Sequence, residues 1–245
     1  MNIFLNFKQI LINAFYPKHI KCIYCGNEIT TKNVYDMCEN CNKTLPFISK
    51  NFCVRCGLQF EKDGSGTCLN CKSSNFNFTI ARSALNFDGK VVSAIHKFKY
   101  ARYKFLAEPF AHILYRTLVK QNWNFDIICY VPLFEKREKE RGYNQSRELA
   151  RNLSKLTSVP VFDGILRIRD TPTQTSLTRK QRKENVKDSF KITSKTALKN
   201  LNILLIDDVF TTGSTTNEIS RELKSANANN IYVLTIAHAG FKQKF

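Results

Sequence analysis

The spacing of apolar residues predicts alternating strands and helices over most of the chain after residue 77. Short apolar runs of strand length lie at 78–86, 127–131, 161–168, 189–193, 201–206 and 231–237. Helical patterns at 91–103, 107–120 and 216–226 separate several of them. Such alternation favours a doubly wound parallel α/β sheet that binds its ligand at the carboxyl ends of the strands.

One of these runs ends in a pattern that suits a phosphate. The apolar strand around Ile206 ends in Asp207 and Asp208, and a helical pattern begins a few residues later. The intervening loop is rich in hydroxyl groups and contains a single glycine, in the order Thr211, Thr212, Gly213, Ser214 and Thr215. Free N–H groups at a helix start, the helix dipole and these hydroxyls together predict an anion site.

The two carboxylates need a different partner, because they repel a phosphate. Ribose hydroxyls suit them through charge-assisted hydrogen bonds, and a Mg²⁺ between sugar and diphosphate relieves the remaining charge. An exposed Asp-Asp turn after a core strand is the simpler alternative. A Walker-type nucleotide site is excluded, because the only Gly-Lys step, Gly89-Lys90, continues with Val91.

The segment Ile203 to Thr215 resembles the signature of type I phosphoribosyltransferases, which bind 5-phosphoribosyl-1-pyrophosphate (PRPP). The resemblance implies that Asp207 and Asp208 hold the ribose hydroxyls and that residues 211–215 hold the 5-phosphate. It also implies a pyrophosphate loop after the strand at 127–131. The loop residues expected to take part are Pro132, Leu133, Lys136 and Arg137.

Eight of the nine cysteines fall into four evenly spaced Cys-x-x-Cys pairs. They are Cys22, Cys25, Cys38, Cys41, Cys53, Cys56, Cys68 and Cys71. Two such pairs surround one tetrahedral metal, so we expect two structural zinc ions. Redox-active pairs are the alternative. We expect sequential pairing of the motifs, because it closes shorter loops, although an interleaved arrangement satisfies the same ligand count. The ninth, Cys129, is expected to pack in a core strand.

The charge of the chain indicates a polyanionic partner. The chain has 38 basic and 20 acidic residues, and 29 of the basic and 15 of the acidic ones lie in residues 80–245. Candidate contacts to such a polyanion are Arg137, Arg141, Tyr143, Arg179, Lys180, Arg182 and Lys183, with Tyr143 available for stacking on the bases of a nucleic acid. The alternative for the cluster at 179–183 is a solvated helix face. No apolar stretch has the length of a membrane span, and residues 1–17 read as an amphipathic helix, so we expect a cytoplasmic protein.

The order of motifs resembles the ComF family of DNA-uptake competence proteins. Besides the features above, it includes Phe15-Tyr16-Pro17, Val131-Pro132-Leu133, Arg141-Gly142-Tyr143-Asn144-Gln145 and Arg169-Asp170-Thr171-Pro172. The resemblance implies a zinc-binding module at 18–76 and a phosphoribosyltransferase-like domain at 77–245. It implies a role with incoming single-stranded DNA in natural transformation, alongside proteins such as a helicase.

Two functions remain open from the sequence. The first is DNA handling with a pocket for PRPP and Mg²⁺, or for a related phosphorylated ribose. The second is an active phosphoribosyltransferase of nucleotide metabolism. An amidotransferase version is disfavoured, because the N-terminus lacks a glutaminase-type cysteine nucleophile.

Overall fold

The computed structural model describes residues 20–240 except 32, 62–63, 65, 101–102 and 172–177. The helix expected at 1–17 therefore lies outside the described residues. Within them, no helix has the length and apolar character needed to cross a membrane.

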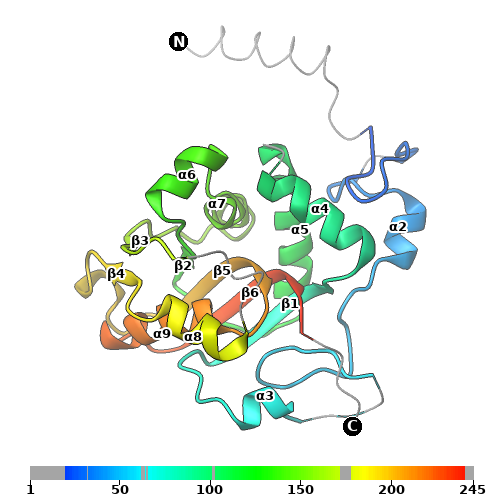
Figure 1. Ribbon diagram of the computed structural model, residues 1–245. Coiled ribbons are helices and arrows are strands. Elements are labelled where there is room, and N and C mark those ends of the chain that lie inside the picture. The colour runs from blue at the N-terminus through cyan, green and yellow to red at the C-terminus, as the bar shows by residue number, and fades with distance from the viewer. Residues whose placement is uncertain are drawn as a thin grey trace, which may run out of the picture.

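The centre of the fold is a parallel sheet of four strands in the order β1-β6-β5-β2 (Figure 1). These strands are β1 (Ile80–Asn86), β2 (Ile127–Tyr130), β5 (Ile203–Phe210) and β6 (Ile231–His238). The strand predicted at 231–237 lies inside the sheet, between β1 and β5, where it is hydrogen-bonded on both sides. Its near-continuous burial fits an interior position.

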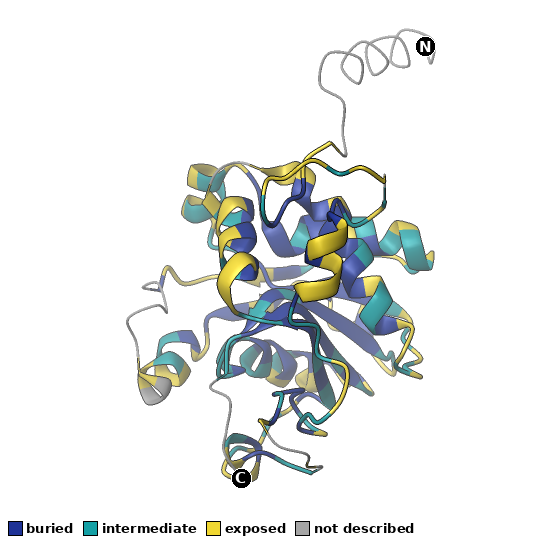
Figure 2. Ribbon diagram, turned by 90° about the vertical axis from the view of Figure 1, so that its right-hand side faces the viewer, coloured by how far each residue is buried: buried dark blue, intermediate teal, exposed yellow. Residues whose placement is uncertain are grey.

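Helices cover both faces of this sheet, which confirms the doubly wound α/β fold. They are α4 (Gly89–Tyr100), α5 (Ala107–Leu118), α7 (Gln145–Thr157), α8 (Arg179–Val186) and α9 (Ser214–Ser225), with short 3-10 turns η1 (Lys104–Leu106) and η3 (Thr196–Leu198). Helix α6 (Glu135–Arg141), between β2 and α7 in the chain, has no buried residue. Alternate residues of β5 serve the two faces: Leu204 and Ile206 pack with the α4–α5–α7 side, and Ile203 and Leu205 pack with the α9 side. Figure 2 shows the resulting buried sheet between partly exposed helices.

Two predicted strands do not join the parallel sheet. They form a separate antiparallel pair, β3 (Ile165–Arg167) with β4 (Phe190–Ile192). The expected strand at 161–168 is broken, because Val161 makes only a single bridge to Ile128 before the chain turns away. Strand length alone could not distinguish these short segments from the strands of the main sheet.

The cysteine-rich segment forms two small ribbons that pack near β1 on opposite faces of the sheet. The first ribbon, which contains α2 (Glu39–Thr44), packs on the α5 side, where the rings of Tyr24 and Phe110 are 6.3 Å apart. The second ribbon, which contains α3 (Leu69–Lys72), shares a core with the α9 side. The Arg55 guanidinium fixes it by donating to the carbonyl oxygens of Phe76 and Phe78, each at 2.8 Å.

Candidate functional site

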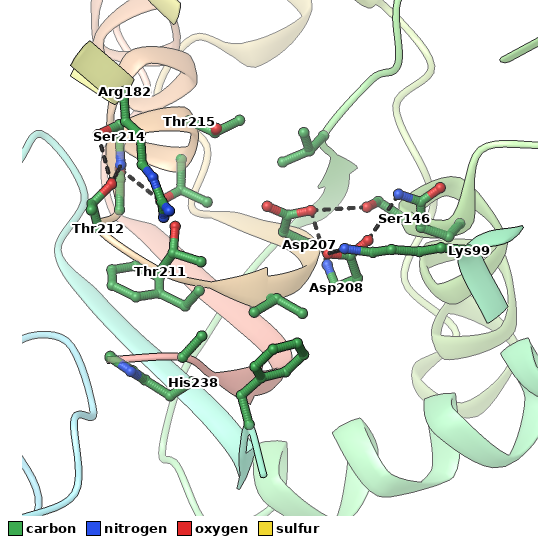
Figure 3. A pocket seen from close by; sticks show the side chains of 18 of the residues that line it. Lys99, Ser146, Arg182, Asp207, Asp208, Thr211, Thr212, Ser214, Thr215 and His238 are labelled. Carbon is green, nitrogen blue, oxygen red and sulfur yellow. Dashed lines mark hydrogen bonds and ion pairs between the residues drawn. The ribbon is translucent and has the colours of Figure 1, made fainter. Parts of the chain in front are cut away.

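A cavity of about 1060 Å³ opens at the carboxyl ends of β5 and β6, where the fold predicts a ligand. Asp207, Asp208 and the whole loop from Thr211 to Thr215 line it. Figure 3 shows the two acids on one side of this space and the hydroxyl-rich loop on the other. The structure therefore brings together the two parts of the predicted sugar-phosphate site.

The two acids are held inside the end of β5. The strand was expected to end before them, but it continues to Phe210, and Asp207 pairs with Thr235 of β6. Asp208 is buried and receives the Lys99 ammonium at 2.8 Å on one oxygen and the Gln145 amide at 2.8 Å on the other. Asp207 is half-buried and accepts from the Ser146 hydroxyl at 3.1 Å.

This arrangement raises the proton affinity of Asp207. Burial, followed by the adjacent charge of Asp208, raises the pKa of Asp207 to about 7, while Lys99 and Ser146 oppose the shift. Asp208 thus has a partner on each oxygen, whereas the pKa of Asp207 lies close to neutral pH. A cation or a hydroxyl donor entering the cavity gains most by meeting Asp207.

The loop after β5 leads into a helix start that faces the cavity. Gly213 precedes α9 with φ +77°, a conformation that other residues rarely adopt, and a Cβ there would lie 2.7 Å from the Phe210 ring. The hydroxyls of Thr212 and Ser214 lie 2.8 Å apart. Since α9 has 12 residues, its unpaired N–H groups and dipole add to these donors at one point.

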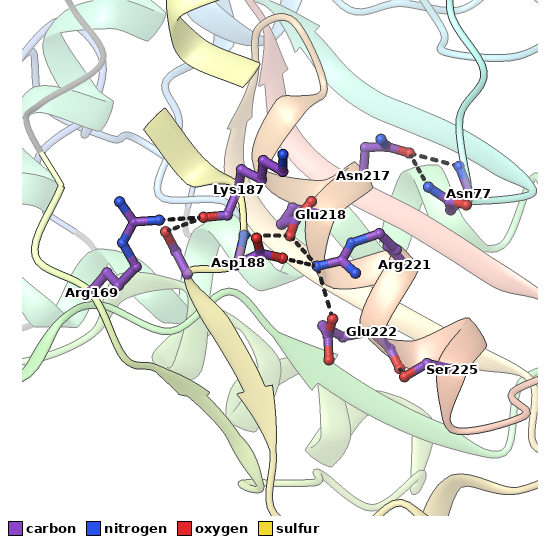
Figure 4. A network of polar contacts seen from close by, with 10 residues as sticks. Asn77, Arg169, Lys187, Asp188, Asn217, Glu218, Arg221, Glu222 and Ser225 are labelled. Carbon is purple, nitrogen blue, oxygen red and sulfur yellow. Dashed lines mark hydrogen bonds and ion pairs between the residues drawn. The ribbon is translucent and has the colours of Figure 1, made fainter. Parts of the chain in front are cut away.

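Arg182 adds a cation above this loop. It is half-buried on α8, lines the cavity, and points toward Thr211 and Thr212 in Figure 3. The end of α8 is anchored to α9 by the network in Figure 4. There the Arg221 guanidinium meets Asp188 and Glu218, each at 2.7 Å, and the Asp188 N–H donates to Glu218 at 2.8 Å.

The predicted pyrophosphate loop reaches the cavity only in part. Leu133 and Arg137 line the cavity, Pro132 is buried, and Lys136 is exposed and is not among the lining residues. Arg137 donates to the Thr171 carbonyl and pairs with Asp170 at 3.4 Å. Arg167 on β3 also lines the cavity, and burial, then the nearby charge of Arg137, lower its pKa. Two guanidinium groups in one wall make an attractive place for an anion.

The expected DNA contacts divide into several groups. Tyr143 was expected to stack on bases, and this is wrong: its ring is buried against Phe98, 5.8 Å between centroids, and its hydroxyl donates to the Phe98 carbonyl. Arg141 lines the cavity, with its guanidinium 5.0 Å from the Tyr100 ring. Lys183 is exposed. Arg179 and Lys180 belong to α8, and their side chains lie outside the described part of the chain.

The eight paired cysteines form two four-sulfur clusters, in the sequential arrangement. Cys22, Cys25, Cys38 and Cys41 make the first, and Cys53, Cys56, Cys68 and Cys71 the second; within each, all sulfurs lie within 4.8 Å of one another. Sulfurs bound at ~2.3 Å to a tetrahedral zinc lie ~3.8 Å apart, and the Cys25–Cys38 and Cys56–Cys68 distances are 3.6 and 3.7 Å. The residues fit structural zinc.

Each cluster contains thiols of lowered pKa beside thiols, such as Cys41 and Cys56, whose pKa is raised. Burial raises the pKa of Cys22, but hydrogen bonds from the backbone N–H groups of Cys38, Cys25 and Tyr24 lower it to about 7. Hydrogen bonds from Cys56, Cys68 and Cys71 lower the pKa of Cys53 far below the ordinary thiol value. Cys129, as expected, is a buried core residue.

Several residues around the acids were not assigned to the site by the sequence. Lys99, Gln145 and Ser146 hold the carboxylates, and Arg167 lines the same cavity. From the second ribbon, Cys56, Leu58 and Asn70 line the same cavity. Gln145 belongs to the ComF-like motif at 141–145, but no sequence feature linked it to the acids. Asn144 caps α7 by accepting from the Arg147 N–H at 3.2 Å, which places Gln145 and Ser146 at the start of that helix.

Comparison with known proteins gives one family profile and one partial structural overlay. A family profile described as "Double zinc ribbon domain" matches residues 11–72. The solved glutamine PRPP amidotransferase of B. subtilis overlays 57% of this chain and 30% of its own, with 16% identity and a TM-score of 0.39. That overlay is partial, and the fold is defined by the sheet and ribbons described above.

Two curated relatives extend over nearly the whole chain. "Competence protein ComFC" of Streptococcus pneumoniae is 27% identical over 236 residues, 89% of this chain and 99% of its own length. "Competence protein F" of Haemophilus influenzae is 32% identical over 231 residues, 90% of this chain and 98% of its own. With two sulfur clusters in front of a parallel α/β sheet and relatives of this extent, the chain belongs to the ComF family of competence proteins.

Proposed function

We propose that this protein acts in DNA uptake, where it handles single-stranded DNA and binds PRPP or a related phosphorylated ribose with Mg²⁺. The observation that carries the proposal is the meeting of an Asp pair and a hydroxyl-rich helix start in one cavity. The names of the relatives, which refer to competence, support the biological setting.

The acid pair suits the sugar. Asp208 is fixed on both oxygens, so its position is set before a ligand arrives, and Asp207 keeps capacity to accept further hydrogen bonds. Carboxylates in this state accept ribose hydroxyls through charge-assisted bonds worth ~1.5–3 kcal/mol each. Lys99 balances part of the charge of the acid pair. Mg²⁺ balances the charge of the diphosphate.

The loop and its surroundings suit the two phosphate groups. The 5-phosphate takes the N–H groups and hydroxyls of residues 211–215 and the charge of Arg182. The diphosphate takes the wall that contains Arg137 and Arg167. The Nε–H of Arg167 is buried with no hydrogen-bond partner among the described residues, which suits a wall awaiting an anion.

An active phosphoribosyltransferase is the second candidate, and one observation favours it. Such an enzyme needs cover for an acceptor base and protection from water. Leu58 and Asn70 of the second ribbon line the cavity and supply one covering wall. Incubation with labelled PRPP, with and without candidate bases, tests this function by release of pyrophosphate.

The binding proposal is tested by titration calorimetry of the whole, zinc-loaded protein with PRPP and Mg²⁺. We expect Asp207→Asn with Asp208→Asn to weaken binding by about 100-fold or more, since at least two charge-assisted hydrogen bonds are lost. The matched control is Asp126→Asn. Asp126 accepts from the Asn202 N–H at the other end of the sheet, at 2.8 Å. Unchanged affinity in a folded double variant would contradict the assignment.

A further inference from the structure

Three aromatic side chains lie exposed in one short segment at the end of α4. Tyr100, Tyr103 and Phe105, which we call the aromatic patch, have exposed fractions of 58%, 42% and 60%. The rings of Tyr103 and Phe105 are 5.3 Å apart, and His96 lies 4.6 Å from Tyr100. These rings are not part of the buried core. Exposed apolar groups gathered in this way mark a binding surface.

The surroundings of the aromatic patch are basic. Residues 89–107 contain five lysines and arginines and no acidic residue. Lys97 is exposed, and the Arg141 guanidinium lies 5.0 Å from the Tyr100 ring. Lys104, with 58% of its side chain exposed, has one acidic contact, Glu148 of α7 at 3.2 Å. Aromatic and basic side chains therefore alternate on this surface.

The aromatic patch continues from the cavity. Tyr100 and its neighbours Lys99 and Arg141 line the cavity, whereas Tyr103 and Phe105 are not among the lining residues. The patch thus includes one residue that lines the cavity and two that lie outside it. The helices that carry Tyr100 and Arg141, α4 and α6, lie near the top of Figure 1.

We propose that the aromatic patch stacks bases of single-stranded DNA while Lys97, Lys104 and Arg141 contact the phosphates. Rings between cations match a strand whose bases and phosphates alternate, and stacking accepts any base. Duplex DNA does not fit, because its bases are already stacked with one another. This inference rests on the proposed handling of single-stranded DNA and gives that function a surface other than buried Tyr143.

The test uses fluorescence anisotropy of the full chain with a labelled 20-nucleotide oligo(dT) over a series of salt concentrations. Tyr103→Ala with Phe105→Ala removes two rings and no charge. We expect at least about a tenfold loss of affinity with an unchanged slope against salt. Lys97→Ala should instead reduce the slope by about 0.7. Tyr115→Ala, an exposed aromatic on α5, is the matched control and should match the wild type.

The outcomes separate this inference from the proposed function. If the wild type binds oligo(dT) and the double variant binds equally well, only the aromatic patch is overturned. If the wild type does not bind oligo(dT), DNA handling and the patch both fail, while PRPP titration still tests the cavity. Retained DNA binding with lost affinity for anionic phospholipid vesicles would overturn the patch in favour of a lipid surface. Tyr103→Phe with Phe105→Tyr keeps both rings and should retain wild-type affinity.

Discussion

The ion pair between Lys99 and Asp208 allows a quantitative test of the acid pair. The Lys99 side chain is 23% exposed and that of Asp208 is 7% exposed, with 2.8 Å between Nζ and Oδ1. Lys99→Met removes the charge and keeps most of the side-chain volume. Opposite charges 4 Å apart near a protein surface attract by ~4 kcal/mol, and solvent around a partly exposed lysine reduces this. We expect a loss of about 2 kcal/mol in the free energy of unfolding at pH 8.

The pH dependence distinguishes this charge effect from simple packing. The pKa of Asp207 in the folded chain is raised to about 7. Its carboxyl therefore contributes most to stability below about pH 4, where it is protonated in both the folded and the unfolded chain. This contribution is lost as the pH rises toward 7. At pH 5 the Asp207 carboxyl is protonated and neutral, and at pH 8 it is ionised, so Lys99 has one more negative charge near it at pH 8. The cost of Lys99→Met should therefore fall to about 1 kcal/mol at pH 5.

Urea unfolding of both proteins at pH 5 and pH 8 measures this difference. Comparison of variant with wild type at each pH cancels protonation of the zinc ligands. Lys97→Met is the matched control, because Lys97 is exposed on the same helix and makes no ion pair among the described residues. It should cost less than about 0.5 kcal/mol. An equal cost of Lys99→Met at both pH values would refute the electrostatic reasoning.

Two further predictions concern zinc and α8. Metal analysis should return about two zinc ions per chain. Cys56→Ser should weaken PRPP binding more than Cys25→Ser, because, of the two ribbons, the second one lines the cavity. Equal effects of the two substitutions on PRPP affinity would contradict a role of the second ribbon in the site. Arg182→Ala should weaken PRPP binding about tenfold or more, measured by calorimetry. Lys183→Ala should change only the dependence of DNA affinity on salt, measured by anisotropy. The reverse pattern would contradict the placement of α8.

Continuous motifs were predictable from the sequence, because their chemistry lies in one stretch. The acids, the hydroxyl-rich loop and the following helix start are neighbours along the chain, so their meeting in space needs only a strand and a turn. The two metal clusters were equally predictable, because regularly spaced Cys-x-x-Cys pairs indicate shared metal sites. The doubly wound architecture followed from apolar runs between helical patterns.

Features that depend on tertiary packing were not predictable. Lys99 lies more than one hundred residues before Asp208, and no local pattern joins them. Tyr143 follows two residues typical of a surface turn, yet its ring fills a space left by α4. The short strands β3 and β4 have the apolar content of sheet strands, and only their antiparallel pairing separates them from the parallel sheet.

The second ribbon has a consequence for how metal and ligand depend on each other. Its residues share a core with α9, and the ring of Phe76, just beyond its last cysteine, lies against Gly213 at the start of that helix. Coupling between two binding sites is reciprocal. If zinc in this ribbon raises the affinity of the cavity for its ligand, the ligand raises the affinity of the ribbon for zinc by the same factor. The first ribbon packs on the other face and lies outside this coupling. The two metals, alike in their ligands, are therefore unequal in what their loss would change.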